Sequence, residues 1–384
     1  MVSMLLAGCG FFASNPRPDD PNAVKPDPPA AATRWSSLHW QSVTFDDPDN
    51  ASLEQEDWPE ALAEGPGGFV AVGSNHDTTG YVGRIWHSAD ALDWQLVDSP
   101  ELDALELTDV VASDEAFLAI GHRAANPNAP VTSILTSTDG TTWNEAETIE
   151  DAWAIDIASG PNGFAILLEV GETSDVLTSP DGASWMRVAG ADIAPNLYLP
   201  NIAWAGDGWV AAGTSGNRAV LFRSADGLTW VEERLPASEP IDGIWRVSAY
   251  RVLPGRWATL VLGIDSAPSC EEDDDWCPKF QGAWSHTAAT GWARLPRSNW
   301  LFDRGYGVDV HLAGDAGFLY MLGEDARISS DGWDWTDVES AEDAQLTREV
   351  LVSGRRVIAA GWQIGDAPAL DAWFGTATIE LEAD

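Results

Sequence analysis

Residues 137–143 read Ser-Thr-Asp-Gly-Thr-Thr-Trp, and this seven-residue pattern returns along the chain. Its general form is Ser-x-Asp-Gly-x-x-Trp, with Ala91 replacing the glycine in the first copy. The aspartate and tryptophan of the five copies are Asp90 and Trp94, Asp139 and Trp143, Asp181 and Trp185, Asp226 and Trp230, and Asp331 and Trp335. A degenerate sixth copy, from Ser285 to Trp292, lacks the aspartate and is one residue longer.

The motif has the chemistry of a tight turn between two β-strands. Glycine adopts positive φ without steric cost, and aspartate and serine side chains bond to nearby backbone amides. The tryptophan begins the next strand, where its ring can be buried against a neighbouring sheet. The motif therefore predicts a structural turn and not a catalytic site.

A second pattern precedes each copy, an aromatic residue that starts a strand of the form Phe/Trp-x-Ala-x-Gly or close to it. The aromatics lie 45–48 residues apart, with one last interval of 61, and are Phe69, Phe117, Phe164, Trp209, Trp257 and Phe318. A repeat of this length, with several short strands and no helical periodicity, is typical of β-propeller blades.

The two ends of the chain complete the number of blades. Residues 350–376 supply three strands without a further motif, and residues 35–45 supply a lone strand with Trp40 at the motif position. Joining them removes a free sheet edge. We therefore predict an all-β, seven-bladed propeller over residues 33–378, whose last blade is closed by the N-terminal strand, followed by a tail at 379–384.

The N-terminus predicts a lipid anchor. Met4-Leu5-Leu6-Ala7-Gly8-Cys9 resembles a bacterial lipobox, whose cysteine receives the lipid, so residues 1–9 are interpreted as a truncated signal peptide. No basic residue precedes Cys9, although signal peptides begin with one, and we expect the true start upstream. Residues 10–32 are rich in Pro and Asp and are expected to be a disordered tether. The expected location is outside the cytoplasm, anchored to the bacterial cell membrane.

The remaining two cysteines, Cys270 and Cys277, bracket an acidic segment in an insertion at 264–281 of the fifth blade. An oxidising exterior permits a disulfide there, and a metal site is the weaker interpretation because no histidine is nearby. Calcium is the one cofactor considered, at this acidic loop; otherwise none is expected.

The formal charge of −41 limits the range of partners. Such a surface repels nucleic acid and anionic lipid headgroups, so we expect no nucleic-acid binding and no membrane contact apart from the lipid on Cys9. The charge favours solubility and the binding of cations or of a basic partner. We expect a monomer.

The repeated motif resembles the Asp-box, or BNR, repeat of sialidase-like propellers, although these copies lack one residue between Asp and Gly. The resemblance covers about residues 33–378 and implies that the motif lies on the blade periphery. The Phe/Tyr-Arg-Ile-Pro motif of sialidases is missing, and the nearest string, Gly83-Arg84-Ile85-Trp86, falls on a strand. Seven blades also differ from the six of sialidases. We therefore expect a non-catalytic recognition or assembly module that binds an unidentified protein or glycan. The alternative is a sialidase-like or other carbohydrate-active hydrolase, because a carboxylate pair could lie among 61 acids.

Ligands of propellers bind at loops that join the second and third strands or successive blades. The acidic insertion is the first candidate. The candidate residues on this face are His76, Asp77, His122, Arg123, Arg218, Asp273, Asp274, Asp275, Trp276 and Glu324.

Overall fold

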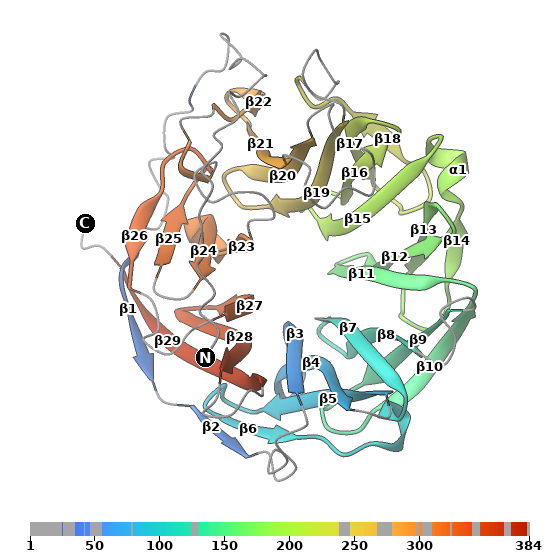
Figure 1. Cartoon of the computed structure of the whole chain (residues 1–384), viewed down its shortest axis with the longest axis vertical. Helices are drawn as coiled ribbons and strands as arrows, with labels where there is room; N and C mark the ends of the chain where they lie inside the picture. Colours follow the sequence, from blue (N-terminus) through green and yellow to red (C-terminus); the bar gives the residue numbers. More distant parts are fainter. Residues whose placement is uncertain are drawn as a thin grey trace, which may run out of the picture.

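The computed structural model is a ring of seven β-sheets around a central axis (Figure 1). It describes residues 25, 35–41, 43–46, 56–77, 80–123, 130–237, 246–266, 279–296, 299–301, 309–322, 325–339, 346–364 and 370–381. Six sheets have four strands and one has five, counting described strands. The chain is therefore a seven-bladed β-propeller, as predicted.

Each blade is built from consecutive strands, the first of which lies nearest the axis. Blade 1 contains β3 (Glu56–Gly65), β4 (Gly68–Asp77), β5 (Gly80–Ser88) and β6 (Asp93–Leu96), and blade 2 contains β7 (Leu105–Ala112), β8 (Phe117–Arg123), β9 (Val131–Ser137) and β10 (Asn144–Glu150). Blade 3 contains β11 (Trp153–Gly160), β12 (Gly163–Val170), β13 (Thr173–Ser179) and β14 (Met186–Val188), and blade 4 contains β15 (Leu197–Trp204), β16 (Trp209–Ser215), β17 (Arg218–Ser224) and β18 (Val231–Glu233). Blade 5 contains β19 (Arg246–Pro254), β20 (Thr259–Ser266), β21 (Lys279–Thr287) and β22 (Gly291–Arg294), and blade 6 contains β23 (His311–Leu312), β24 (Phe318–Leu322), β25 (Asp325–Ser329) and β26 (Thr336–Val338).

Both ends of the chain form blade 7, which confirms the predicted closure. It contains β27 (Leu346–Ser353), β28 (Arg356–Ile364), β29 (Leu370–Leu381) and, outermost, β1 (Trp35–Gln41), which pairs antiparallel with β29. β29 extends to Leu381, beyond the boundary expected at residue 378. A short strand, β2 (Thr44–Asp46), then pairs in parallel with β6 of blade 1 and forms its fifth strand.

Short helical turns occur in connections within the described part of the chain. They are η1 (Pro100–Leu102), α1 (Gly190–Ile193) and η3 (Gly314–Ala316). No helix among the described residues is long and apolar enough to cross a membrane.

The repeated motif forms the turn between the third and fourth strands. In blade 2, the Ser137 hydroxyl donates to the Asp139 carboxylate at 3.1 Å and accepts from the Gly140 amide at 2.9 Å. Asp139 Oδ1 accepts from the amides of Thr141 and Thr142 at 2.8 and 2.7 Å. The Trp143 indole donates to the Gly140 carbonyl at 3.0 Å. The side chains of the turn thus find hydrogen-bond partners within the turn itself. The ring of Trp143 packs in the apolar cluster between blades 1 and 2.

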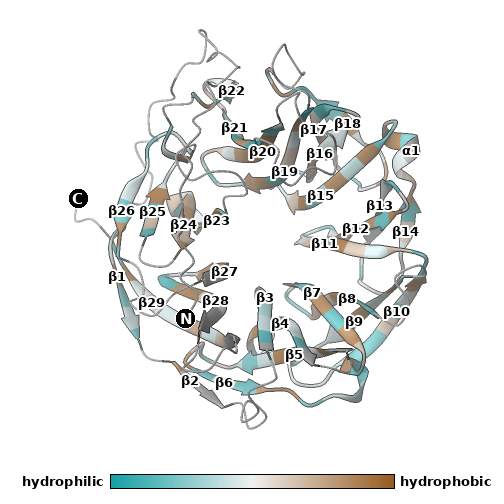
Figure 2. Ribbon diagram, in the orientation of Figure 1, coloured by the Kyte–Doolittle hydropathy of each residue, from teal (hydrophilic) through white to brown (hydrophobic). Residues whose placement is uncertain are grey.

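Apolar contacts between neighbouring blades form the core. The buried residues fall into seven clusters, each shared by two adjacent blades, and one of them joins blade 7 to blade 1. In that last cluster Trp94 stacks on Phe374 at 4.5 Å between ring centroids. Outer strands such as β10 and β18 are mainly hydrophilic, whereas inner strands such as β15 and β19 carry apolar segments (Figure 2). Burial is therefore distributed around the ring and not concentrated in one centre.

Candidate functional site

The inner strands share an irregularity that aligns one residue per blade around the axis. The pairing of the inner strand with the second strand shifts by one residue in β3, β7, β11, β15, β19 and β27. A bulge of this kind turns the strand and redirects a side chain. The residues that follow the shift are Ala61, Asp109, Asp156, Asn201, Arg251 and Glu349.

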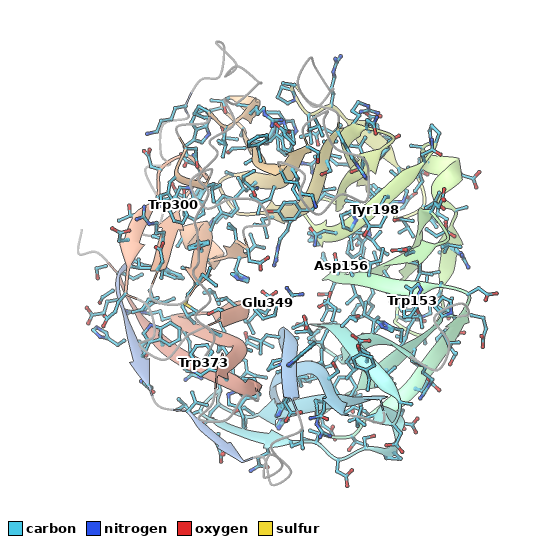
Figure 3. The ribbon with its side chains drawn as sticks, viewed as in Figure 1. Trp153, Asp156, Tyr198, Trp300, Glu349 and Trp373 are labelled. Atoms are coloured by element: carbon cyan, nitrogen blue, oxygen red, sulfur yellow. The ribbon has the colours of Figure 1, made fainter. Side chains whose placement is uncertain are left out.

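Blade 6 completes the set with Asp309, which lies two residues before β23. Its Oδ1 is 3.5 Å from Arg251 of blade 5. We call Asp109, Asp156, Asn201, Arg251, Asp309 and Glu349 the axial ring. Asp156 and Glu349 lie on opposite sides of the central opening (Figure 3).

In one half of the axial ring, each side chain bonds to the backbone of the next blade. In each case the side-chain oxygen accepts a hydrogen bond from a backbone N–H of the next blade. The donor is the residue directly after the ring residue of that blade. The bonds are Ile157 N–H to Asp109 Oδ2 at 3.1 Å, Ile202 N–H to Asp156 Oδ2 at 2.6 Å and Val252 N–H to Asn201 Oδ1 at 2.7 Å. Asn201 Nδ2 also donates to Asp156 Oδ2 at 2.9 Å. Blades 2 to 5 are therefore tied together at the axis.

Ion pairs occupy the other half. Arg251 lies 3.5 Å from both Asp309 Oδ1 and Glu349 Oε2, a long distance for a charged hydrogen bond. Glu349 Oε1 is 3.0 Å from His311 Nδ1 and accepts from the Val350 amide at 3.0 Å. His311 is fully buried, whereas the side chains of Arg251, Glu349 and Asp309 are 23, 25 and 42% exposed. Asp109, Asp156 and Asn201 are also partly exposed. We call Arg251, Asp309 and Glu349 the open half, because the contacts of Arg251 are long whereas the other half is held by short hydrogen bonds.

Asp109 and Asp156 form a hydrogen-bonded carboxyl pair with raised pKa values. Burial, the negative charge of Asp109 and the hydrogen bond to Asp109 raise the pKa of Asp156 well above its usual value. Burial also raises the pKa of Asp109 to about 6, although the bond from Asp156 and two backbone amides oppose this effect. Two carboxylates in contact cannot both remain charged at low cost.

Glu349 behaves in the opposite way. Its burial favours the neutral form, but His311 and Arg251 outweigh that effect and lower the pKa of Glu349 to about 2. Burial would lower the pKa of Arg251, but the charges of Glu349, Asp309 and Asp156 raise it. The axial ring thus combines a carboxyl with a raised pKa, a carboxylate with a lowered pKa and a cation.

The predicted motif aspartates lie at turns of the blades, outside the axial ring. Backbone amides of the turn lower the pKa of Asp90, Asp139, Asp181 and Asp226. Asp331 differs because burial raises its pKa. The indoles of Trp230 and Trp335 donate to the carbonyls of Gly227 and Gly332, as Trp143 does to Gly140. Trp94 and Trp185 have no such bond among described residues.

The described candidates on the ligand face each bond within their own blade and do not converge. His122 Nε2 lies 2.9 Å from Glu106, and Arg123 contacts Glu145 at 3.1 Å. Arg218 forms an ion pair with Glu232. The other predicted site residues lie outside what the structure describes: the side chains of His76 and Asp77, and the whole of Cys9, Cys270, Asp273, Asp274, Asp275, Trp276, Cys277 and Glu324.

Sequence reasoning missed the axial ring, although a signal was present. A polar residue stands eight positions before the first residue of the aromatic strand pattern in several repeats. Examples are Asp109 before Phe117, Asp156 before Phe164 and Asn201 before Trp209. This is a third feature in register with the repeat, and it would have pointed to the axis.

No group of three or more His, Cys, Asp or Glu within the described ranges is arranged to hold a metal ion. The ring carboxylates instead bond to amides, to Arg251 or to His311.

Comparison with known proteins yields distant structural likenesses. No protein-family profile matches the chain, and no curated protein matches it. The α-L-arabinofuranosidase Arb93A of Fusarium graminearum is 10% identical, with 91% of this chain and 98% of that chain covered and a TM-score of 0.46. The β-propeller domain of the trilobed protease of Pyrococcus furiosus is 11% identical, with 71% and 83% covered and a TM-score of 0.42. At these levels neither structure informs the activity of this chain.

Proposed function

We propose that the protein is a non-catalytic recognition propeller that binds its ligand at the open half of the axial ring. This proposal rests on the hydrogen bonds that the ring carboxylates make. Asp109 and Asp156 accept hydrogen bonds from backbone amides of the next blade and are hydrogen-bonded to each other, so their oxygens are committed to holding the ring. A catalytic acid must instead reach the substrate with its proton.

The open half suits a ligand that both donates and accepts hydrogen bonds. Arg251 offers donors, whereas Asp309 and Glu349 offer acceptors, and all three are partly exposed. A ligand of one charge sign would meet repulsion from one of them. Neutral hydroxyl or amide groups of a glycan or a protein loop satisfy both kinds of partner.

The setting of the protein is part of the same proposal. The repeated motif supports membership among Asp-box propellers. We place the protein outside a bacterial cell as a monomer, with a lipid on Cys9 and residues 10–32 as its tether. A disulfide between Cys270 and Cys277 would close the acidic insertion of the fifth blade. The charge of −41 disfavours nucleic acid as a partner.

Binding and catalysis are separated by one pair of assays. The full chain is applied to a glycan array and incubated with a panel of aryl glycosides, beside Arg251→Gln and a control, Arg256→Gln, in which an exposed arginine is changed. We expect binding without turnover, lost in Arg251→Gln and kept in the control. Turnover by the unchanged chain would reject the non-catalytic role.

One observation favours a second function, that of a carbohydrate-active hydrolase. The pKa of Asp156 is raised while that of Glu349 is lowered to about 2, and such a divergence marks acid and base pairs in glycosidases. Asp156→Asn and Glu349→Gln would each abolish hydrolysis if this function holds. Hydrolysis that persists in both variants would exclude this pair as its origin.

A further inference from the structure

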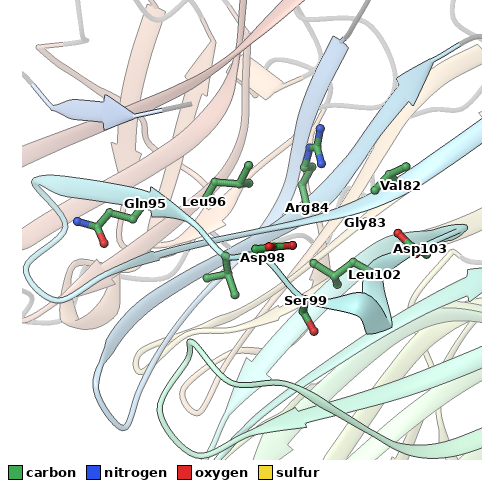
Figure 4. A pocket seen from close by; sticks show the side chains of 10 residues that line it. Val82, Gly83, Arg84, Gln95, Leu96, Asp98, Ser99, Leu102 and Asp103 are labelled. Atoms are coloured by element: carbon green, nitrogen blue, oxygen red, sulfur yellow. The ribbon is translucent and has the colours of Figure 1, made fainter. Parts of the chain in front are cut away.

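A cavity of 630 Å³ lies in the outer part of blade 1, where the chain leaves for blade 2 (Figure 4). It is separate from the axial ring, because its walls come from β5, β6 and the connection that contains η1. β6 pairs with β5 at only two residues, and the connection then curves away before Asp103 bridges back to Val82. This departure of the chain from the sheet edge leaves the cavity, whose volume is within the usual range for small-molecule sites.

A mostly buried arginine forms one wall. The Arg84 side chain is 14% exposed, and its Nε donates to Asp57 Oδ1 at 3.0 Å. Asp57 is itself buried and is further fixed by Asn75 at 2.8 Å. Within the described part of the chain no residue accepts a bond from the two Nη groups of Arg84. The guanidinium is therefore oriented by Asp57 and has donors left for a ligand.

The connection between blades supplies acids and apolar surface. Asp98 and Asp103 are exposed acids on the lining, and Leu96, Leu102 and Val82 add aliphatic surface (Figure 4). Leu102 is 5% exposed and packs between blades 1 and 2, whereas Leu96 packs on the other face of the sheet. Val82 and Arg84 lie on the same face as Leu96, because alternate residues of β5 share a face and Leu96 pairs with Trp86. The cavity thus offers a cation, two carboxylates and an aliphatic patch.

This combination discriminates between ligand classes. A simple anion would meet Asp98 and Asp103 as well as the overall charge of −41, and a simple cation would meet Arg84. A zwitterion satisfies both, because its carboxylate can bond bidentately to the guanidinium and its ammonium group to the acids. We propose that this cavity binds a free α-amino acid with an aliphatic side chain, whose carboxylate lies at Arg84, whose ammonium group lies at Asp98 and Asp103, and whose side chain contacts Leu96 and Val82.

The test uses calorimetry on the full chain with three related probes. L-leucine carries both charges, L-leucinamide lacks the carboxylate, and 4-methylpentanoate lacks the ammonium group. Loss of one charge-assisted partner is expected to weaken binding about tenfold or more. L-leucine should therefore bind, and each of the other probes should bind at least that much more weakly. No heat with L-leucine at millimolar concentration, or equal affinity for L-leucinamide, would overturn the proposal.

Variants assign each end of the ligand. Arg84→Gln should weaken L-leucine about tenfold or more and leave L-leucinamide unchanged, because the amide does not depend on the guanidinium. That change also removes the partner of buried Asp57 and can impair folding, so Asp98→Asn, at an exposed position, provides a second test. It should weaken L-leucine and leave 4-methylpentanoate unchanged. Asp114→Asn, in the exposed turn after β7, is the control and should bind like the unchanged chain. Equal L-leucine affinity in Asp98→Asn and Asp114→Asn would contradict the assigned ammonium site.

Discussion

At the scale of single residues, the motif turn shows how backbone conformation and packing select an amino acid. Gly140, Gly182, Gly227 and Gly332 have φ between 73° and 81°, and Ala91 reaches 61° at the same position. A left-handed residue other than glycine costs roughly 1–2 kcal/mol. In blade 1 the Ala91 methyl is fully buried in the cluster between blades 7 and 1, so packing offsets the backbone cost.

The balance between backbone strain and packing predicts a large loss of stability for one substitution at this position and a small change for another. A Cβ on Gly227 would lie 2.6 Å from Thr178 Oγ1 and 2.9 Å from Thr178 Cβ, so Gly227→Ala combines strain with overpacking. We expect a loss of about 2–3 kcal/mol of unfolding free energy. Ala91→Gly relieves strain but removes a buried methyl, and should change stability by less than about 1 kcal/mol. Chemical denaturation measures both, and an equal loss in the two variants would contradict this account.

At the scale of elements, the inner strands are joined by polar bonds at the axis as well as by apolar contacts. The bulge in each of these strands places the ring residue, and the next blade supplies the donor. The donor is always a backbone amide, which is present whatever side chain the donor residue carries. Any ring residue whose side-chain oxygen reaches that amide can accept the bond. The repeat therefore tolerates Asp109, Asp156 and Asn201 at one position.

Asn201→Leu tests the contribution of one such bond. It leaves the amide of Val252, a residue only 1% exposed, without its acceptor and removes one donor from Asp156. An unsatisfied buried amide costs about 1–3 kcal/mol, and we expect a loss of that size. Asn144→Leu, at an exposed position of β10, is the matched control and should lose much less. Similar losses in the two variants would show that the axial bond contributes little.

The Asp109–Asp156 pair predicts a stability that falls as the pH rises. A carboxyl whose pKa is about 6 in the folded protein and near 3.8 when unfolded binds more protons in the folded state between those values. Stability should therefore decrease from about pH 4 to pH 6. Asp156 contributes in the same direction, because its pKa is also raised in the folded protein. Asp156→Asn removes one of the two titrating carboxyls and should reduce this slope, whereas Asp114→Asn should not. Melting temperatures across this range measure both, and an unchanged slope in Asp156→Asn would contradict the contribution of Asp156.

At the scale of the whole molecule, seven equivalent interfaces close a ring, and the last interface depends on the N-terminal strand. β1 pairs with the edge of β29 from Trp35 to Gln41, and Leu38 is fully buried between blades 6 and 7. Because each blade packs on two neighbours, loss of one interface opens the ring. β1 thus acts as the closing strand of the molecule.

Two truncations test the closure. Deleting residues 1–32 leaves β1 in place and should leave the melting temperature unchanged. Deleting residues 1–43 removes Leu38 and exposes the edge of β29, which should lower the melting temperature and promote association. Leu38→Ala in the full chain should cost about 2–5 kcal/mol. Equal melting temperatures for the two truncations would show that the ring closes without β1.

Much of the fold could be predicted from the sequence because it depends on local chemistry that repeats. The Ser-x-Asp-Gly-x-x-Trp turns bond within seven residues, and the aromatic strand patterns keep the same spacing, so both can be recognised without knowing the neighbours. The unmatched strand at Trp40 and the three strands after residue 346 indicated closure in the same way.

Which residues of the candidate site contact one another could be found only in the tertiary structure, because they meet across blades. Asp109 and Ile157 are 48 positions apart, and Arg251 and Glu349 are 98 apart, so no local pattern joins them. The bulges that direct these side chains to the axis are set by register, and the shifted pKa values of Asp156 and Glu349 arise from burial and from charges on other blades. The repeated turns and strand patterns in the sequence determined the propeller and its closure. Only the tertiary structure decided which polar residues face one another, because these long-range contacts arise when the ring closes and do not follow from the spacing of residues in the sequence.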